Sequence, residues 1–559
     1  MSEKDKKDKD PEKLRVGVFI CDCGSNIAGH LDCPAVTEYA STLPGVVFTK
    51  ENLYTCSEAG ILEIQKAIKE NDLNRVVVAS CTPRTHGPLF MSSCAQAGLN
   101  PYLFEMTNIR DQCSWVHMGQ HEKATEKAKD LVRMGVAKSV SLEPQQEIET
   151  SLICKALVIG GGVAGLSAAD ALASMGLEVI LVEKETKFGG LLRKINRLAD
   201  GELAADRILA LVENVKSKSN ITIHLDSEAK TVGGYIGNYD ITIKTKEKTV
   251  EDKVGCIIVA TGALPLIPTD MFGYDGKGVI TQIELEEKLK NGSLDAQRIV
   301  MVQCVGARTQ GREYCSRICC MTAVKNALLI KEQNPDADIH ILYRDMQMYG
   351  TENEKMLWEA RGMGIKFEVY DAEKPPEVET GKVGFYQSLL GENMEIACDL
   401  VVLSTPLVPR EDAGIVSQML RVPMNQDGFF LEAHAKLRPL DFAADGIFLC
   451  GSARYPATAT EAISQGIGVS ARVASILFKD KLITSAIVAQ INPETCVGCM
   501  GCMDVCPYQA ISFNQEEYVC EINEILCKGC GNCAATCPSH SAMLKGFKPQ
   551  QLLSMIRAA

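Results

Sequence analysis

The sequence predicts a multidomain α/β protein, in which an N-terminal parallel α/β domain and a central Rossmann-type domain precede a small cysteine-rich domain. Continuous apolar runs at 16–20 and 76–79 are typical of strands buried on both faces of a parallel sheet. Another such run, Ala156–Ile159, leads into a glycine-rich turn, and two evenly spaced cysteine runs follow residue 495. We therefore expect a disordered charged tail at 1–13 and domains at 14–150, 151–487 and 488–559.

The composition excludes several classes of protein. The net charge of −13 argues against nucleic-acid binding, because phosphates require a basic surface. No apolar run approaches the roughly 18 residues of a membrane span. The charged start is not followed by the apolar core of a signal peptide, so we expect a cytoplasmic protein. In such a chain, 24 cysteines indicate reduced thiolates that bind metal rather than disulfides.

Four cysteines of the N-terminal domain lie just after expected strands or before an expected helix: Cys21, Cys23, Cys56 and Cys81. The helix is expected at 58–69, with Ser57 as its N-cap. In open parallel sheets, ligand sites lie beyond the carboxyl ends of the strands, and helix N-termini favour thiolate over thiol. These cysteines are therefore candidate ligands of an iron–sulfur cluster. The alternative is that they are ordinary buried cysteines, because their spacing is not diagnostic.

The central domain begins with the pattern G-x-G-x-x-G between an expected strand and an expected helix, and an acidic residue ends the next strand. Gly160 makes the tight turn, Gly162 lets the backbone approach a pyrophosphate at the helix N-terminus, and Gly165 allows close helix–strand packing. Glu183 is expected to accept hydrogen bonds from ribose hydroxyls. The predicted dinucleotide-binding residues of this segment are Gly160, Gly162, Val163, Ala164, Gly165, Glu183 and Lys184.

Further glycine motifs in this domain indicate that the dinucleotide is FAD. In sequence order they resemble those of the thioredoxin-reductase-like flavoprotein superfamily, over roughly 153–480. The resemblance implies that the backbone at Gly189, Gly190 and Leu191 contacts the flavin. It also implies that the segment with Gln465 and Gly466 covers the pyrimidine end of the flavin. Ser452 departs from the aspartate usual at its position. The implied FAD-binding residues are Gly189, Gly190, Leu191, Ala260, Thr261, Gly262, Gly451, Ser452, Gln465 and Gly466.

This superfamily normally carries a second nucleotide fold for NADPH, which we expect in degenerate form at about 265–405. The expected strand 298–303 is present, but the glycine loop after it is replaced by a segment with four cysteines, Cys304, Cys315, Cys319 and Cys320. We expect Cys315 and Cys319 on one helical face, since they are four residues apart. We interpret the four as ligands of a cluster in the place of NADPH. The alternative is that they are small buried hydrophobic residues.

The C-terminal domain contains two runs of the form C-x2-C-x2-C-x3-C-P, which is the bacterial ferredoxin spacing for two [4Fe–4S] clusters. The fourth cysteine of each run binds the other cluster. One predicted ligand set is Cys496, Cys499, Cys502 and Cys537, and the other is Cys527, Cys530, Cys533 and Cys506. A zinc ribbon also uses C-x2-C pairs, but it does not require three evenly spaced cysteines and a Cys-Pro, repeated twice.

The order of these parts, together with the segments 21–34, 79–90 and 304–320, resembles the A-type polypeptide of heterodisulfide reductase over residues 14–545. Larger members of that family carry an inserted ferredoxin domain after the region of Gly189 and Gly190. Residues 191–255 contain no cysteine, so we expect a short form that lacks this insert.

The resemblance implies a cytoplasmic FAD and iron–sulfur subunit that transfers electrons from a donor module to a disulfide-type or low-potential acceptor. In some complexes of the family, the FAD bifurcates electron pairs between two acceptors. It implies a homodimer in a complex with B- and C-type subunits and a hydrogenase, formate dehydrogenase or NADH-oxidising module. It also places Lys325 next to the flavin N5, the alternative being a lysine that extends into water. Two other functions stay open: an NAD(P)H-dependent flavin oxidoreductase similar to the small subunit of glutamate synthase, and a relay subunit of a quinone-interacting membrane complex.

Overall fold

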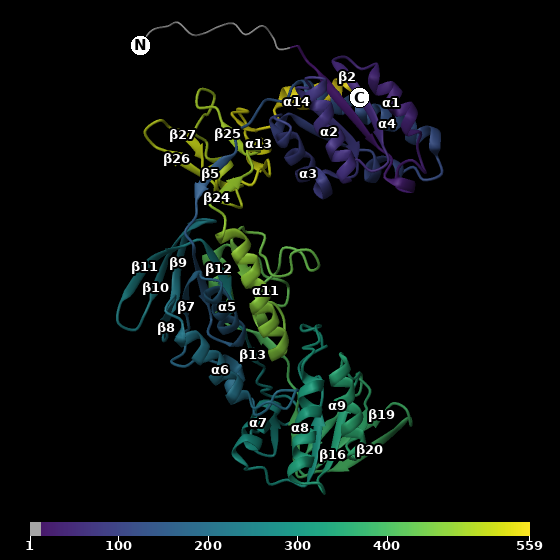
Figure 1. Cartoon of the computed structure of the whole chain (residues 1–559). Coiled ribbons are helices and arrows are strands. Elements are labelled where there is room, and N and C mark those ends of the chain that lie inside the picture. The colour runs from purple at the N-terminus through teal and green to yellow at the C-terminus, as the bar shows by residue number, and fades with distance from the viewer. Residues whose placement is uncertain (1–12) are drawn as a thin grey trace. The chain divides into compact units, whose positions relative to one another are not determined.

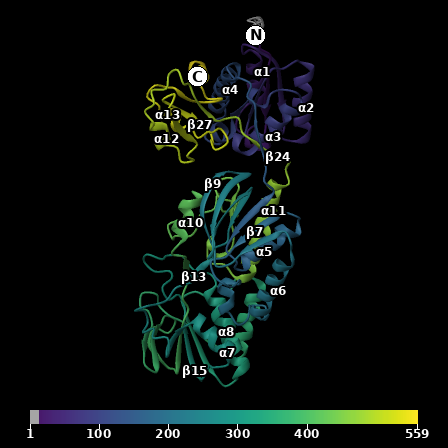
Figure 2. The same ribbon diagram turned by 90° about the vertical axis from the view of Figure 1, so that its left-hand side faces the viewer.

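The structure, a computed structural model, describes residues 13–559 (Figures 1 and 2). Most of the predicted charged tail, residues 1–12, lies outside the described residues. The chain forms two compact units, of which the first joins the residues up to Glu149 with Ile483–Ala559, and the second is Thr150–Leu482. No helix within residues 13–559 combines the length and the apolar character that a membrane crossing requires.

The N-terminal part of the first unit is a parallel sheet with helices on both faces, as the apolar runs predict. Its strands, in the order β2-β1-β3-β4, are β1 (Val16–Cys21), β2 (Val46–Asn52), β3 (Arg75–Ser80) and β4 (Phe104–Asn108). Its helices are α1 (Cys33–Ser41), α2 (Glu58–Glu70), α3 (Pro83–Gln96) and α4 (His121–Val140). Val18 packs with α1 and α4, whereas Phe19 packs with α2 and α3, because successive side chains of a strand point to opposite faces. Ser57 caps α2 as predicted and accepts from the Gly60 N–H at 3.3 Å.

The C-terminal part of the first unit contains short strands and helices around a small core of cysteines and a few aliphatic side chains. The two antiparallel strand pairs are β25 (Ala489–Ile491) with β28 (Ala542–Leu544), and β26 (Ile511–Asn514) with β27 (Val519–Ile522). The helices are α12 (Gly501–Asp504), α13 (Asn532–Thr536) and α14 (Pro549–Ala558). The Gln551 side chain donates from α14 to the carbonyl of Ser141, 2.9 Å away, at the end of α4. The described residues 13–149 and 483–559 therefore belong to one packed unit.

The second unit begins with a nucleotide-binding fold, a five-stranded parallel sheet in the order β23-β12-β6-β7-β8. The strands are β6 (Lys155–Ile159), β7 (Glu178–Val182), β8 (Ile221–His224), β12 (Cys256–Val259) and β23 (Ile447–Leu449). One face packs against α5 (Val163–Ser174) and α11 (Ala459–Leu477), with α6 (Ala204–Ser217) beside α5. The other face packs against the antiparallel strands β9 (Glu228–Tyr235), β10 (Asn238–Lys244) and β11 (Thr249–Val254), and α10 (Ala413–Leu420).

A second fold of the same design is inserted into the first (Figure 1). Its parallel sheet, β14-β21-β15-β16-β17, consists of β14 (Val279–Thr281), β15 (Arg298–Val302), β16 (Asp338–Tyr343), β17 (Lys366–Val369) and β21 (Leu400–Leu403). The helices α7 (Gln282–Asn291), α8 (Cys319–Gln333) and α9 (Thr351–Gly362) pack on one face, and the strands β18 (Glu377–Glu379), β19 (Lys382–Gln387) and β20 (Glu392–Ala397) on the other. The pair β13 (Ala263–Pro265) and β22 (Leu407–Pro409) connects the two folds.

Candidate functional site

The turn between β6 and α5 requires glycine at two of its predicted positions. Gly160 has φ +112°, and a Cβ added there would lie 2.4 Å from the Ala260 carbonyl oxygen. A Cβ on Gly165 would lie 1.9 Å from the carbonyl oxygen of Gly160. At Gly162, the N-cap of α5, an added Cβ would meet nothing within 4 Å. The first two glycines therefore allow the turn itself, whereas Gly162 leaves open space in front of a helix N-terminus, where anions bind favourably.

The structure shows a further glycine that the sequence pattern did not single out. A Cβ on Gly161 would lie 2.4 Å from the Phe188 ring and 2.9 Å from Oε2 of Glu183. This Glu183 oxygen accepts from the Gly161 N–H at 2.6 Å, and the other accepts from the Glu185 N–H at 2.7 Å. Burial raises the pKa of Glu183, although these hydrogen bonds and two nearby arginines oppose the shift. Glu183 thus holds the turn, and each oxygen retains a lone pair for a hydroxyl donor.

A large cavity of about 1330 Å³ opens beside this turn. Its volume exceeds the roughly 300–1,000 Å³ usual for a small-molecule site. The predicted FAD residues that line it are Gly160, Gly162, Val163, Ala164, Glu183, Lys184, Gly189, Gly190, Leu191, Ala260, Thr261, Gly262 and Ser452. The Lys184 ammonium is already paired with Asp412 at 3.0 Å and Glu228 at 3.1 Å.

Four predicted FAD residues do not line the cavity: Gly165, Gly451, Gln465 and Gly466. A Cβ on Gly466 would lie 2.4 Å from the Ala164 carbonyl oxygen, so this glycine allows α11 to pack closely on α5. Gly451 has φ +67°, and its N–H donates to Oε1 of Gln465 at 2.9 Å. These residues support the cavity wall from behind.

Lys325 on α8 also lines the cavity, and only 8% of its surface is exposed. Its ammonium forms an ion pair with Glu286 of α7, which is fully buried, and donates to the carbonyl of Arg197 at 2.9 Å. Burial lowers the pKa of Lys325, while Glu286 acts in the opposite direction. The side chain therefore does not extend into bulk water. Sequence reasoning missed Glu286, because a glutamate in an amphipathic helix gives no sign that it will be buried.

The structure brings Cys304, Cys315, Cys319 and Cys320 together at the carboxyl end of β15. The pKa of Cys320 is raised to about 11, mainly by burial and in part by the nearby thiols of Cys304 and Cys315. The pKa of Cys319 is raised by burial and by the other three thiols. The expectation that Cys315 and Cys319 share a helical face is wrong, since α8 begins only at Cys319. Arg317, with φ +64°, keeps the preceding segment out of the helix.

The four N-terminal cysteines also lie within electrostatic range of one another. Burial raises the pKa of Cys81, Arg110 lowers it, and the thiols of Cys23, Cys21 and Cys56 raise it again. The Thr55 N–H donates to the Cys21 sulfur at 3.4 Å, and the Arg110 guanidinium donates to the Cys23 sulfur at 3.8 Å. The site therefore includes a cation that the sequence motifs did not indicate.

The C-terminal cysteines approach one another across the two runs. The Cys496 thiol interacts with that of Cys537. The Cys533 thiol interacts with Cys527, Cys530 and Cys506. In each case a cysteine of one run is close to the last cysteine of the other, which is the arrangement expected of a two-cluster ferredoxin.

Hydrogen bonds from the backbone and from serines point at several of these sulfurs. The Ala489 N–H donates to Cys527 at 3.3 Å, and the Ala510 N–H donates to Cys506 at 3.4 Å. Burial disfavours the Cys537 thiolate, but hydrogen bonds from Ser541, the Ala542 N–H and Ser539 lower the pKa of Cys537 to about 6. Such hydrogen bonds stabilise thiolates, and they tune the reduction potentials of clusters that the thiolates bind.

All 24 cysteines of the chain are free of disulfides. Within residues 13–559, no three His, Cys, Asp or Glu side chains are gathered closely enough to hold a single metal ion. A cubane cluster differs from a single ion, because each of its thiolate ligands binds a different iron atom.

Comparison with known protein families agrees with the two kinds of site. Residues 154–466 match the family described as pyridine nucleotide-disulphide oxidoreductase, and residues 495–541 match the 4Fe-4S dicluster domain. The chain therefore has an oxidoreductase domain of the pyridine nucleotide-disulphide oxidoreductase family and a 4Fe-4S dicluster domain of ferredoxin type. Among solved structures, thioredoxin reductase from T. acidophilum is 16% identical, covers 58% of this chain and 99% of its own, and has a TM-score of 0.41.

Two curated relatives match almost the whole chain. The second A-type iron–sulfur polypeptide of CoB–CoM heterodisulfide reductase from Methanopyrus kandleri is 37% identical over 90% of this chain and 92% of its own. The A-type polypeptide of H(2):CoB-CoM heterodisulfide,ferredoxin reductase from Methanothermobacter thermautotrophicus is 36% identical over 91% of this chain and 92% of its own.

Proposed function

The chain belongs to the family of A-type heterodisulfide reductase polypeptides and is an oxidoreductase with flavin and [4Fe–4S] domains, and from this premise we propose a more specific role. It is the electron-transfer subunit of a heterodisulfide-reductase-like complex. Electrons pass from a donor module through FAD and iron–sulfur clusters to a disulfide-type or low-potential acceptor.

The observation that carries this proposal is the position of α8. The helix begins with Cys319 and Cys320, and the residues that follow, Met321, Thr322 and Lys325, line the cavity. With a rise of about 1.5 Å per residue, Lys325 lies roughly 7.5 Å along the axis from Cys320. A cluster on the four cysteines would thus lie next to the cavity wall, about one and a half helical turns from Lys325.

The residues of the cavity fit FAD. The space in front of Gly162 and the N-terminus of α5 would take the pyrophosphate, and Glu183 would accept from the ribose. Gly189 and Gly190 have φ values of +107° and +52° and place backbone, without side chains, on the cavity wall. Bound FAD exchanges electrons one or two at a time, which connects two-electron chemistry to one-electron carriers. The protein would hold the flavin close to Cys319 and Cys320, because the residues that follow them on α8 line the cavity.

The cysteine sets fit four [4Fe–4S] clusters. Two are held by the ferredoxin-like segment, and one by the Cys304 set, which consists of Cys304, Cys315, Cys319 and Cys320. The fourth is held by the four N-terminal cysteines, whose neighbour Arg110 stabilises thiolate charge. The differing hydrogen bonds and charges around the four sets would give them different potentials.

The second nucleotide fold argues against a pyridine nucleotide as electron source. In the FAD fold, three residues (160–162) connect strand and helix, and one of them, Gly162, leaves open space for the close approach of a pyrophosphate. In the second fold, the corresponding connection has sixteen residues (303–318) and carries cysteines and arginines. We therefore propose that electrons reach the flavin from clusters, supplied by a hydrogenase, formate dehydrogenase or NADH-oxidising partner.

The proposal extends to the assembly. We infer a cytoplasmic complex with B- and C-type subunits, in which this chain is a homodimer and its FAD bifurcates electron pairs between two acceptors. The name of the Methanothermobacter relative joins hydrogen, a heterodisulfide and ferredoxin, which is the combination that bifurcation requires.

The decisive experiment is anaerobic purification of the full chain with its partners, followed by FAD and iron analysis. We expect about one FAD and, from four cubane clusters, about sixteen iron atoms per chain. When the full chain is purified without its partners, neither NADH nor NADPH should bleach the flavin. Bleaching by either would indicate an NAD(P)H-dependent oxidoreductase, and co-purification with a haem membrane protein would indicate a quinone-linked relay.

A further inference from the structure

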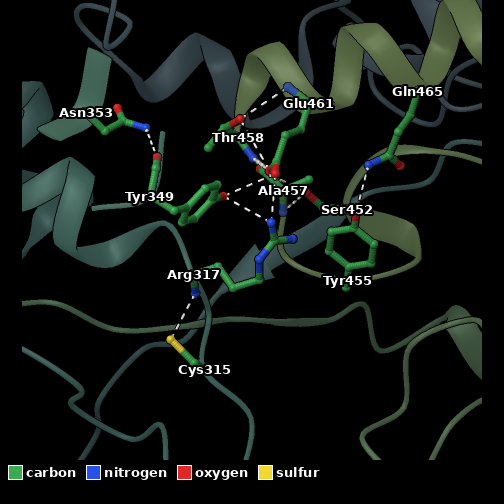
Figure 3. Close-up of polar contacts among 10 residues, drawn as sticks. All are labelled: Cys315, Arg317, Tyr349, Asn353, Ser452, Tyr455, Ala457, Thr458, Glu461 and Gln465. Carbon is green, nitrogen blue, oxygen red and sulfur yellow. Dashed lines mark hydrogen bonds and ion pairs between the residues drawn. The ribbon is translucent and has the colours of Figure 1, made fainter. Parts of the chain in front are cut away.

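Arg317 lies in the segment between β15 and α8, beside one of the proposed cluster ligands (Figure 3). Its N–H donates to the sulfur of Cys315 at 3.3 Å. Its backbone adopts φ +64°, a conformation that residues other than glycine rarely adopt. The backbone of Arg317 is thus turned toward the cysteine site, and its side chain extends the opposite way.

The Arg317 guanidinium is held in place by four contacts. It donates to Oε1 of Glu461 at 2.8 Å and to the Tyr349 hydroxyl at 3.1 Å (Figure 3). It also lies 5.1 Å from the ring centroid of Tyr349 and 4.9 Å from that of Tyr455, close enough for cation–π attraction. The charge of this arginine is therefore fixed rather than free to move in solvent.

The partners of Arg317 belong to the wall of the flavin cavity. Glu461 is the third residue of α11, where its Oε2 accepts from the Thr458 N–H at 2.9 Å in a capping box. Both residues line the cavity, as does Tyr349. Tyr455 continues the connection, since its hydroxyl accepts from Gln465, whose side-chain oxygen in turn accepts from the Gly451 N–H.

We propose that Arg317 is a positioning residue that connects the cysteine site to the flavin cavity and raises the potential of the cluster held there. The inference rests on the proposed function, because it requires a cluster on the Cys304 set. A [4Fe–4S] cluster becomes one unit more negative on reduction, and a fixed cation on the residue whose backbone N–H contacts a cluster ligand favours that reduced state through space. Glu461 partly neutralises the cation and therefore moderates its effect.

This arrangement predicts shifts of opposite sign for the two partners. Arg317→Gln removes the cation, so the potential of the cluster falls. Glu461→Gln removes the neutralising carboxylate, so the potential rises. The second variant keeps the helix cap, because glutamine also serves at this position of a capping box. A contact that only holds the segment in place would give no shift, or shifts in the same direction.

The experiment is an anaerobic redox titration of the full-length, cluster-loaded protein, monitored by electron paramagnetic resonance. The signal of this cluster is identified by its loss in Cys315→Ser. At fixed solution potential we expect the ratio of reduced to oxidised cluster to fall about tenfold in Arg317→Gln, equivalent to about 59 mV for one electron. It should rise in Glu461→Gln and stay near wild type in Arg317→Lys. The matched control is Arg298→Gln, which loses a 2.6 Å ion pair with Asp399 at the opposite end of β15.

Unshifted potentials, or shifts of the same sign in both glutamine variants, would overturn the role of Arg317. If Arg317→Gln fails to load cofactors, Glu461→Gln alone decides, and an unchanged or lower potential refutes the proposal. If Cys315→Ser loses neither iron nor a signal, the cluster itself is absent. That outcome refutes this part of the proposed function, and the inference with it, whereas a present but unshifted cluster refutes the inference alone.

Discussion

Replacing Lys325 tests whether the cation at the cavity wall tunes the flavin. Lys325→Met removes the ammonium and leaves Glu286, which is fully buried, without its counter-charge. Removing one partner of a buried ion pair costs about 3–5 kcal/mol in the free energy of unfolding. The double variant Lys325→Met/Glu286→Gln leaves no buried charge, and the introduced glutamine can still accept from the Asn196 N–H, which now donates to Glu286 at 2.9 Å. We therefore expect the double variant to recover most of the lost stability.

The flavin midpoint potential should not recover in the double variant, in contrast to the free energy of unfolding. Both variants should retain FAD and iron. Because both lack the cation that would stabilise reduced flavin, both should lower the flavin midpoint potential by about 30 mV or more, a tenfold change for a two-electron couple. The assays are urea unfolding and an anaerobic redox titration followed by flavin absorbance. Superimposable flavin curves for wild type and the double variant would refute the role of Lys325 at the flavin. Equal stability of the single and double variants would refute the argument from the buried pair.

Three further predictions concern the cofactor sites. Glu183→Ala should weaken FAD retention by about 1–3 kcal/mol, since a charged acceptor is lost, and unchanged flavin occupancy after gel filtration would contradict this. Gly165→Ala should destabilise the apoprotein, because its Cβ would lie 1.9 Å from a backbone oxygen, whereas Gly162→Ala, which meets nothing within 4 Å, should lower FAD occupancy without changing apoprotein stability. Cys537→Ser should lower the iron content by about four atoms per chain, as one cubane cluster is lost, and an unchanged content would remove Cys537 from the ligand set.

The parts of the fold that could be predicted are those that local chemistry decides. The strand–glycine–helix unit at 156–174 follows from an apolar run and from Gly160 and Gly165, where a Cβ would clash with the backbone, and the structure has it as β6 and α5. The parallel sheet of the N-terminal domain follows from its apolar runs in the same way. The cysteine pattern of the C-terminal segment is specific because cluster ligation fixes the spacing of its ligands.

Long-range pairings could not be predicted from the sequence. The partnership of Lys325 with Glu286 joins two helices, and each residue alone resembles an ordinary charged surface residue. The packing of α14 on α4 could not be predicted either; it joins residues 13–149 and 483–559 in one unit. The assumption of a helix through Cys315 failed because a single left-handed residue, Arg317, ends the periodic pattern, and no side-chain property of arginine signals that conformation.

The two nucleotide folds of the second unit show how one design can serve two kinds of site. Each has a five-stranded parallel sheet, a three-stranded antiparallel layer and helices on the opposite face. In both, the site lies where the strand at the centre of the sheet meets the next helix, since ligands bind beyond the carboxyl ends of strands. In the first connection Gly162 leaves room for a phosphate group. The sixteen residues of the second supply two thiols, Cys304 and Cys315, and three arginines, and α8 adds the thiols of Cys319 and Cys320. Because α8 begins at Cys319 and Cys320 and its next residues line the cavity, the longer connection and this helix bring the four thiols close to the proposed flavin site.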